Sequence, residues 1–309
     1  MIYKRIFYIL FIIFLTTNIA RSNNIFISTT IDGQIITNID IENEIEYLKI
    51  LNPNLMELNK KQLIEISKES LINEIIKKKE IVKVIEFDQE NSFTKDYIKN
   101  LYSKLNFETE KDFNRYLKAK KNYSLDQIKQ KIKIEILWNE LIYLRFKDQI
   151  RINKRSMLEK IKLIPDRISQ EYLLSEIVFE KKKDEKLKSL IDKIKLSILE
   201  IGFNNTANIY SISESAKFGG EIGWVLENNL SEEIYKNLKE IEEGQFTKVI
   251  QIGNNYLILK IEKIKTSKIS LKDDEELEKM IKFETNKQLN QFSRIFFNKA
   301  KLNYTINEN

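Results

Sequence analysis

The sequence predicts an α+β fold in which a glycine-rich module interrupts a helical body. Six of the seven glycines of this 309-residue chain fall between residues 202 and 253, so tight turns are concentrated in that interval. Strand-like runs surround these glycines, and stretches with helical periodicity lie on both sides of the interval. A helical body made from both ends of the chain, with one compact domain inserted, accounts for this order.

The first 22 residues have the layout of a secretory signal peptide. Lys4 and Arg5 precede an apolar run at residues 6–15, and mostly small and polar residues follow up to Ser22. The apolar run is shorter than the roughly 20 residues that span a bilayer comfortably. We therefore expect export, cleavage after Ser22, and membrane contact only through this segment before cleavage. An uncleaved anchor is the alternative.

A short β-hairpin is expected next, centred on Asp32-Gly33. This dipeptide suits a tight turn that needs positive φ, and β-prone runs at residues 25–28 and 35–36 flank it.

Helical periodicity then extends from residue 38 to about residue 143. Four residues that offer a side-chain oxygen to free backbone amides mark helix starts. They are Asn38, Asn59, Thr109 and Ser124. One face of the last helix is apolar, which predicts core packing. Its residues are Ile134, Leu137, Trp138 and Leu141.

The glycine-rich module begins near Pro165, where a helix is expected to stop. Four strand-like runs and two helical runs follow, in an order that fits one compact α+β domain. The strands are residues 171–179, 221–225, 246–252 and 256–261, and the helices are residues 182–200 and 231–238. The predicted divisions of the chain are the signal peptide at 1–22, an N-terminal helical domain at 23–165, the module at 166–265 and a C-terminal segment at 266–309.

The C-terminal segment returns to helical periodicity. Residues 271–301 form a charged amphipathic helix, and residues 302–306 are expected to close the chain as a strand. Pairing of this strand with the N-terminal hairpin would build one body from both ends of the chain.

Composition excludes several kinds of chemistry. The chain has no cysteine and no histidine, which removes cysteine nucleophiles, thiolate metal sites, the commonest general base and the commonest metal ligand. No phosphate-binding glycine loop opens a helix, so we expect no metal and no cofactor. Lysines alternate with acidic residues along the helices, and the net charge is only +6, so no nucleic-acid partner is expected.

Residues 172–262 resemble a parvulin domain. The strongest resemblance is the stretch from Tyr210 to Trp224, YSISESAKFGGEIGW, which is similar to the family's signature of small residues, a glycine pair and a closing aromatic residue. The turn at 244–246 and the run at 256–260 resemble the family's later turn and closing strand. The resemblance implies a four-stranded antiparallel sheet with surrounding helices and a peptidyl-prolyl isomerase site.

The helical body adds a second resemblance. Residues 31–41, IDGQIITNIDI, look like the start of SurA-type chaperones and are followed by a similar succession of helices. With the predicted signal peptide and the interrupted body, this resemblance implies a periplasmic folding factor. Its partners would be unfolded polypeptides, above all outer-membrane β-barrel proteins, which expose alternating apolar residues before they insert.

The parvulin resemblance also indicates candidate catalytic positions. Glu176 and Leu257 stand where active parvulins carry histidines, and Ser213 stands near a position that is often acidic or cysteine. Glu176 has two interpretations. It either accepts a hydrogen bond from Ser213 or is a surface residue on an edge strand, and the second is the simpler one.

A substrate pocket for the proline ring is implied by the same resemblance. It would use Ile222, Leu230 and Ile234, with Ser213 or Ser215 as a nearby hydroxyl. The three apolar residues are equally compatible with an ordinary core.

Two functions therefore remain open from the sequence. The chain is either a chaperone with an active prolyl isomerase domain or a chaperone whose parvulin domain is catalytically degenerate. Rotation about a prolyl amide requires no covalent chemistry, so the loss of both histidines does not by itself remove activity. A membrane-tethered isomerase is a third possibility if the N-terminal segment is retained.

Overall fold

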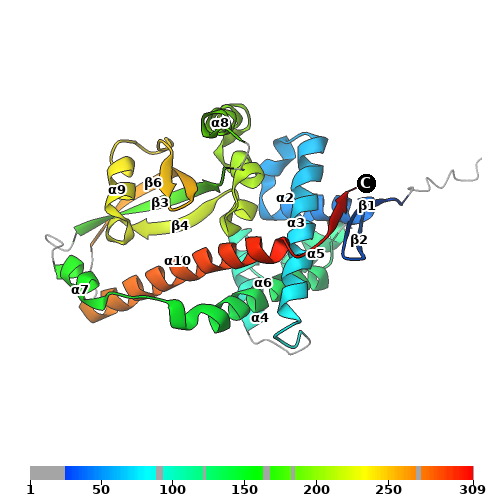
Figure 1. Cartoon of the computed structure of the whole chain (residues 1–309), viewed down its shortest axis with the longest axis horizontal. Coiled ribbons are helices and arrows are strands. Elements are labelled where there is room, and N and C mark those ends of the chain that lie inside the picture. The colour runs from blue at the N-terminus through cyan, green and yellow to red at the C-terminus, as the bar shows by residue number, and fades with distance from the viewer. Residues whose placement is uncertain are drawn as a thin grey trace, which may run out of the picture.

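The computed structural model describes residues 25–87, 93–120, 123–162, 168–181, 185–268 and 273–308 (Figure 1). The predicted signal peptide and Pro165 lie outside the described residues. Among the described residues, no helix combines the length and apolar composition that a membrane crossing requires. The structure has the predicted α+β class, with a helical body and a module that contains a sheet.

The helical body contains both ends of the described chain. Its elements are β1 (Ile27–Ile31), β2 (Gln34–Thr37), α2 (Asn38–Leu51), η1 (Pro53–Glu57), α3 (Lys60–Ile81), α4 (Phe93–Lys104), α5 (Glu110–Lys120), α6 (Leu125–Phe146), η2 (Lys147–Gln149), α7 (Lys154–Lys162), α10 (Asp273–Lys301) and β7 (Ile306–Glu308). Figure 1 shows α10 running from beside α7 to β7, which lies next to the N-terminal hairpin.

A three-stranded antiparallel sheet joins the two ends of the chain, with β1 between β2 and β7. Asp32 and Gly33 have φ angles of 44° and 82°, as the tight hairpin turn requires. The predicted pairing of a C-terminal strand with the hairpin is thus confirmed. That strand occupies residues 306–308 instead of 302–306, because α10 continues to Lys301 and a turn follows it.

Side-chain caps begin the helices close to the predicted places. Three of the expected caps are confirmed, at Asn59, Thr109 and Ser124. The cap of α2 is shifted by one residue, since the Thr37 hydroxyl accepts the hydrogen bond from the Asp40 amide. The side chain of Asn38 instead accepts a hydrogen bond from the Phe26 amide and ties the hairpin to the helix.

The apolar face of α6 packs against α10. The four residues predicted for this face are buried, namely Ile134, Leu137, Trp138 and Leu141. The indole ring of Trp138 stacks on Phe296, and its N–H donates a 2.8 Å hydrogen bond to the Ser293 hydroxyl. Aromatic packing and a buried hydrogen bond therefore hold the C-terminal helix in the body.

The module lies between α7 and α10 in the chain. Its elements are β3 (Ile168–Phe179), α8 (Leu187–Tyr210), η4 (Glu214–Phe218), β4 (Glu221–Leu226), η5 (Glu227–Asn229), α9 (Glu232–Leu238), β5 (Ile250–Ile252) and β6 (Asn255–Lys268). The strands form an antiparallel sheet in the order β4-β3-β6-β5, which confirms the predicted four-stranded sheet.

The two faces of this sheet carry different helices. α8 packs on the face that holds Ile177, and α9 packs on the face that holds Leu174 and Val178. Because successive side chains of a strand point to opposite faces, Glu176 lies on the α9 face. That face carries the candidate site.

Candidate functional site

The stretch from Ser211 to Gly220 forms a loop between α8 and β4. It contains η4 and ends at Gly219 and Gly220, which have φ angles of 71° and 85°. A Cβ atom on Gly220 would collide with the carbonyl oxygen of Glu176, and Gly220 accepts a 2.8 Å hydrogen bond from the Glu176 amide. Glycine meets both the left-handed backbone conformation and the close approach. The glycine pair therefore holds the loop against β3 beside Glu176.

A polar cluster forms where this loop meets β3. The Ser213 hydroxyl donates a hydrogen bond to Glu176 Oε1, and the Ser215 hydroxyl donates to the same oxygen at 3.0 Å. The two serine hydroxyls are 2.8 Å apart. β3 lies between β4 and β6, so the interpretation of Glu176 as a surface residue on an edge strand is wrong. Glu176 is a half-buried hydrogen-bond acceptor for both serines.

The residues proposed for a proline pocket differ in their exposure. Ile222, on β4, is 41% exposed, which leaves its side chain available to a ligand. Leu230 and Ile234 are half-buried and pack against the core between the sheet and α9. All three lie in segments that adjoin this core, and Ile222 is the most accessible of them.

Leu257 is more deeply buried than the other two candidate catalytic residues, Glu176 and Ser213. It is 4% exposed and belongs to the apolar core of the α9 face, together with Val178 and Ile250. A leucine in this position offers neither a proton donor nor an acceptor. Its side chain contributes apolar packing beneath the site.

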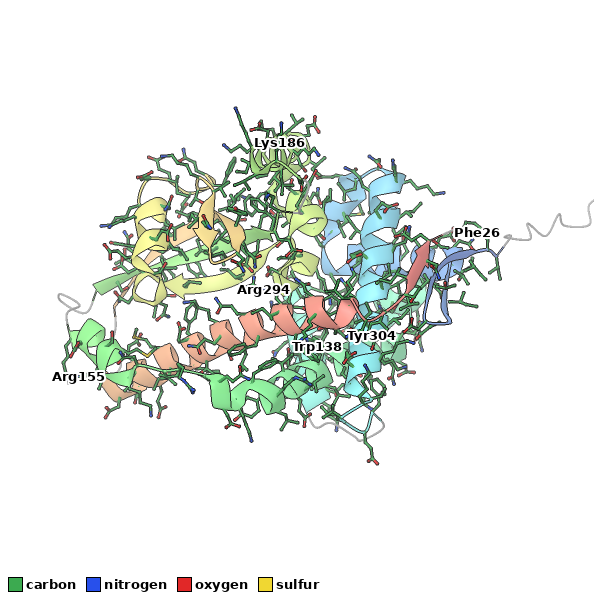
Figure 2. The ribbon with its side chains drawn as sticks, viewed as in Figure 1. Phe26, Trp138, Arg155, Lys186, Arg294 and Tyr304 are labelled. Carbon is green, nitrogen blue, oxygen red and sulfur yellow. The ribbon has the colours of Figure 1, made fainter. Side chains whose placement is uncertain are left out.

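Arg294 is a site neighbour that the sequence did not indicate. Figure 2 shows its side chain between α10 and the sheet of the module. Burial lowers the pKa of the Arg294 guanidinium, and the carboxylate of Glu176 partly opposes that effect. A cation of the helical body therefore lies within electrostatic reach of the polar cluster.

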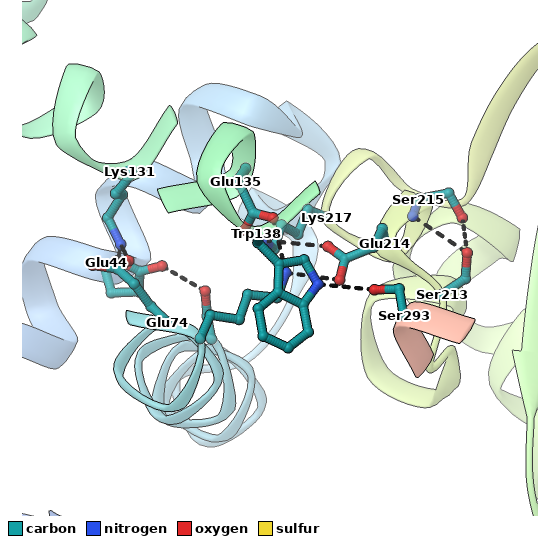
Figure 3. A network of polar contacts seen from close by, with 12 residues as sticks. Glu44, Glu74, Lys131, Glu135, Trp138, Ser213, Glu214, Ser215, Lys217 and Ser293 are labelled. Atoms are coloured by element: carbon teal, nitrogen blue, oxygen red, sulfur yellow. Dashed lines mark hydrogen bonds and ion pairs between the residues drawn. The ribbon is translucent and has the colours of Figure 1, made fainter. Parts of the chain in front are cut away.

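A network of ion pairs joins the module to the helical body (Figure 3). Lys77 of α3 donates to Glu135 of α6 at 2.8 Å and to Glu214 of η4 at 2.7 Å. Lys217 of η4 donates to Glu135 at 2.6 Å. Two of these ion pairs, Lys77–Glu214 and Lys217–Glu135, therefore cross the boundary between the helical body and the module.

The network stabilises its charged forms against the cost of burial. Burial disfavours the Glu135 carboxylate, yet the ammonium groups of Lys217 and Lys77 outweigh it and hold the pKa of Glu135 well below its ordinary value. Burial likewise disfavours the Lys217 ammonium, and Glu135 and Glu214 outweigh it and raise the Lys217 pKa well above its ordinary value. Glu135 and Lys217 therefore face each other as an ion pair at neutral pH.

No group of three or more acidic side chains in the described parts of the chain is arranged to hold a metal ion. The chemistry available at the described site is hydrogen bonding by hydroxyl groups, one carboxylate and a nearby guanidinium, beside apolar surface.

Residues 171–263 match the family described as the PPIC-type PPIase domain, or rotamase. The matched range covers β3 to β6 and includes the polar cluster and the glycine pair. Residues 171–263 of the chain therefore form a PpiC-type domain. The expected parvulin resemblance is confirmed.

Curated relatives of the chain include two chaperones. The chaperone SurA of Pseudomonas putida is 27% identical over 159 residues, which are 47% of this chain and 36% of that protein. The periplasmic chaperone PpiD of Buchnera aphidicola is 31% identical over 193 residues, which are 60% of this chain and 29% of that protein. The chain therefore spans about a third of the length of each of these relatives.

Solved structures give matches of low overall similarity. A structure from Campylobacter jejuni, from work on two SurA-like chaperones, is 15% identical, with 92% of this chain and 98% of that chain covered and a TM-score of 0.35. A crystal structure of a PpiC-type peptidyl-prolyl isomerase domain is 24% identical, with 31% of this chain and 92% of that chain covered and a TM-score of 0.28.

Proposed function

We propose that this protein is a periplasmic folding factor that binds unfolded polypeptide segments and presents X-Pro bonds to its PpiC-type domain. The observation that carries the proposal is the Glu176–Ser213–Ser215 cluster, which lies within the matched domain, on the loop that leads into the strand of the exposed Ile222. The names of the two curated relatives, both chaperones, support the folding role and the compartment. Export rests on the predicted signal peptide.

Isomerisation at such a site needs no acid or base. The planar prolyl amide resists rotation by roughly 18–20 kcal/mol because of its partial double-bond character. A catalyst lowers this barrier by binding the twisted amide better than the planar one. In our proposal the proline ring contacts Ile222 and the edge of the apolar core, while the serine hydroxyls, held by Glu176, contact the polar atoms of the amide.

A binding function without catalysis is the second candidate, and Leu257 favours it. This core leucine and Glu176 replace the two histidines that the parvulin resemblance implies for active members. The polar network is consequently confined to one side of the site. A domain of this kind would hold proline-containing segments without accelerating their isomerisation.

An isomerase assay separates the two candidates. Purified protein, without residues 1–22, is mixed with a proline tetrapeptide, whose uncatalysed isomerisation takes tens to hundreds of seconds. Ser213→Ala and Ile222→Ala are compared with the unmodified protein. Activity that both substitutions reduce supports the enzyme, whereas a rate equal to that of buffer together with peptide binding supports the binding function.

Client binding by the helical body is the other half of the proposal. A cavity of about 370 Å³ opens on the body and is lined by Met56, Phe107, Tyr116 and Tyr123 among others. Such a cavity accommodates an aromatic side chain of an extended client. Outer-membrane β-barrel proteins, with alternating apolar residues, are the clients that we propose.

Prevention of aggregation tests this half. The protein is expected to suppress aggregation of an unfolded β-barrel protein, and Met56→Lys, at the rim of the cavity, to reduce the suppression. Met56 is 68% exposed, so its replacement should not disturb the fold. Val82→Lys is the matched control, since Val82 is 53% exposed and is not among the residues that line the cavity. Equal suppression by both variants would remove the cavity from the proposal.

A further inference from the structure

The loop that carries the site serines also contacts the helical body. Ser213 and Ser215 bind Glu176 of the PpiC-type domain. Glu214 and Lys217 are three residues apart, so they lie on the same side of a 3-10 turn, and both form ion pairs with the body. One short element, η4, therefore connects the candidate site to α3 and α6 (Figure 3).

We propose that Lys77 and Glu135 of the helical body are positioning residues for the PpiC-type site. By binding η4 they hold the hydroxyls of Ser213 and Ser215 against Glu176. This inference rests on the proposed function and extends it, because residues outside the matched domain then determine how well the domain binds proline-containing segments.

The burial of Lys77 strengthens the hold of the helical body on η4. Its side chain is 4% exposed, and its ammonium group contacts one carboxylate of the body and one of η4. Removing one partner of a buried charge strongly destabilises the fold, whereas an exposed ion pair contributes little to the free energy of folding. Movement of η4 away from the body would remove Glu214 from Lys77 and Lys217 from Glu135 at the same time. The site loop is therefore restrained in its docked position.

A second path links the same residues to α10. The ammonium group of Lys77 lies 5.7 Å from the ring centre of Trp138, and Trp138 donates its hydrogen bond to Ser293 of α10. The next residue, Arg294, is the cation that lies near Glu176. The body thus supports the polar cluster from the side of η4 and from the side of α10.

The chain offers a matched control for this inference. Lys131, on the same helix as Glu135, is 9% exposed and forms ion pairs with Glu44 and Glu74. Glu74 is 30% exposed and Glu135 is 33% exposed. This second network lies entirely within the helical body, on α2, α3 and α6. Glu135→Gln and Glu74→Gln each remove one carboxylate from a buried lysine that keeps another.

The experiment compares these two variants in the full chain without residues 1–22. Amide hydrogen exchange is measured over residues 211–220, and binding of a fluorescent proline peptide is measured by anisotropy. Glu135→Gln is expected to accelerate exchange in the loop roughly tenfold and to weaken peptide binding several-fold, while Glu74→Gln leaves both unchanged. Glu135→Asp, which keeps the charge, is expected to restore part of the loss.

Two outcomes would overturn the inference. One is equal acceleration of loop exchange in Glu135→Gln and Glu74→Gln, which would indicate general loss of stability. The other is unchanged exchange in Glu135→Gln. If the unmodified protein binds no proline peptide, the proposed site fails, yet the exchange measurement still decides whether the body holds η4. The two failures are therefore distinguishable.

Discussion

The carboxylate of Glu135 lies 2.6 Å from the ammonium group of Lys217, although the two residues are 82 positions apart and belong to different parts of the molecule. The other oxygen of the same carboxylate accepts a hydrogen bond from Lys77 at 2.8 Å. One side chain of α6 thus binds a cation of the body and a cation of the PpiC-type domain. This ion-pair network is one of the contacts between the domain and the body, and only the folded chain assembles it.

The ion pairs of Glu135 with Lys77 and Lys217, the second of which joins the PpiC-type domain to the helical body, are expected to weaken in acid. Burial raises the pKa of the Glu135 carboxyl, but the ammonium groups of Lys217 and Lys77 outweigh this effect and hold the pKa well below the ordinary value of 4.5. A group with a depressed folded pKa contributes stability above its unfolded pKa and loses it as the pH falls through the folded pKa. The melting temperature of the unmodified protein should exceed that of Glu135→Gln at neutral pH, and the difference should shrink below pH 4.5.

The basic side of this pH profile follows from Lys217. Its folded pKa is raised above the ordinary value of 10.5, so its contribution is complete below 10.5 and is lost as the pH rises through the folded pKa. The difference in melting temperature should therefore be constant between about pH 6 and 9. A difference that changes steadily across this range would contradict the assignment of an ionised pair.

Gly220→Ala is expected to destabilise the PpiC-type domain more than Gly223→Ala. Both glycines have positive φ, 85° and 83°, so each substitution carries backbone strain of roughly 1–3 kcal/mol. Only Gly220 also lies against Glu176, whereas a Cβ atom on Gly223 meets nothing within 4 Å. Denaturant unfolding, followed by a probe in the domain, measures both free energies. Equal losses would mean that the contact with Glu176 adds nothing.

Ile222→Ala should reduce peptide binding without unfolding the domain. The side chain is 41% exposed, so its truncation should change the free energy of unfolding by less than about 1 kcal/mol. If the proline ring covers it, the affinity should fall by roughly 1–2 kcal/mol, since each buried methylene is worth about 0.8 kcal/mol. Titration with a proline peptide measures this loss.

The control for Ile222 is Ile35→Ala. Ile35 is 50% exposed on β2, in the sheet that joins the chain ends, which is separate from the sheet of the PpiC-type domain. Its truncation should leave peptide affinity unchanged. A loss of affinity in both variants would point to a general effect of apolar truncation.

The parts of the fold that local sequence determines were predictable. Asp32-Gly33 specified the hairpin turn, and the apolar face of α6 followed from its spacing, because turn chemistry and periodicity depend on neighbouring residues. Element ends were less predictable. The helix expected at residues 182–200 begins at Leu187, and its expected end lies close to Gly202, whose non-helical backbone (φ 82°, ψ 164°) divides α8 into two helical pieces, the second of which ends at Tyr210. The strand expected from Phe246 begins only at Ile250, with a single bridge at Phe246.

The candidate site was predictable only where it lies within one segment. The loop from residue 211 to 220 carries its own signature, so Ser213 and Ser215 could be named from the sequence. Lys77 and Glu135 could not be named, because each stands among interleaved charges that are typical of solvated helix surfaces. Arg294 was missed because it is far from Glu176 in the sequence. Their roles arise from the packing of distant elements, which no local pattern records.

The hydrogen bond between Trp138 and Ser293 is expected to contribute measurably to the joining of the two chain ends. Both side chains are buried, at 1% and 7% exposure, so loss of one leaves the other without a hydrogen-bond partner and shielded from water. Trp138→Phe keeps an aromatic ring that can stack on Phe296 and removes only the donor. We expect Trp138→Phe and Ser293→Ala each to cost about 0.5–1.5 kcal/mol of unfolding free energy.

The double variant decides whether this cost belongs to the bond itself. If the two groups stabilise the fold through each other, the double variant should cost less than the sum of the single losses, because the second substitution then removes a group that has already lost its partner. Denaturant unfolding of all four proteins gives this coupling free energy. Strict additivity would instead assign the losses to altered aromatic packing, such as the stacking of Phe296 on Trp138.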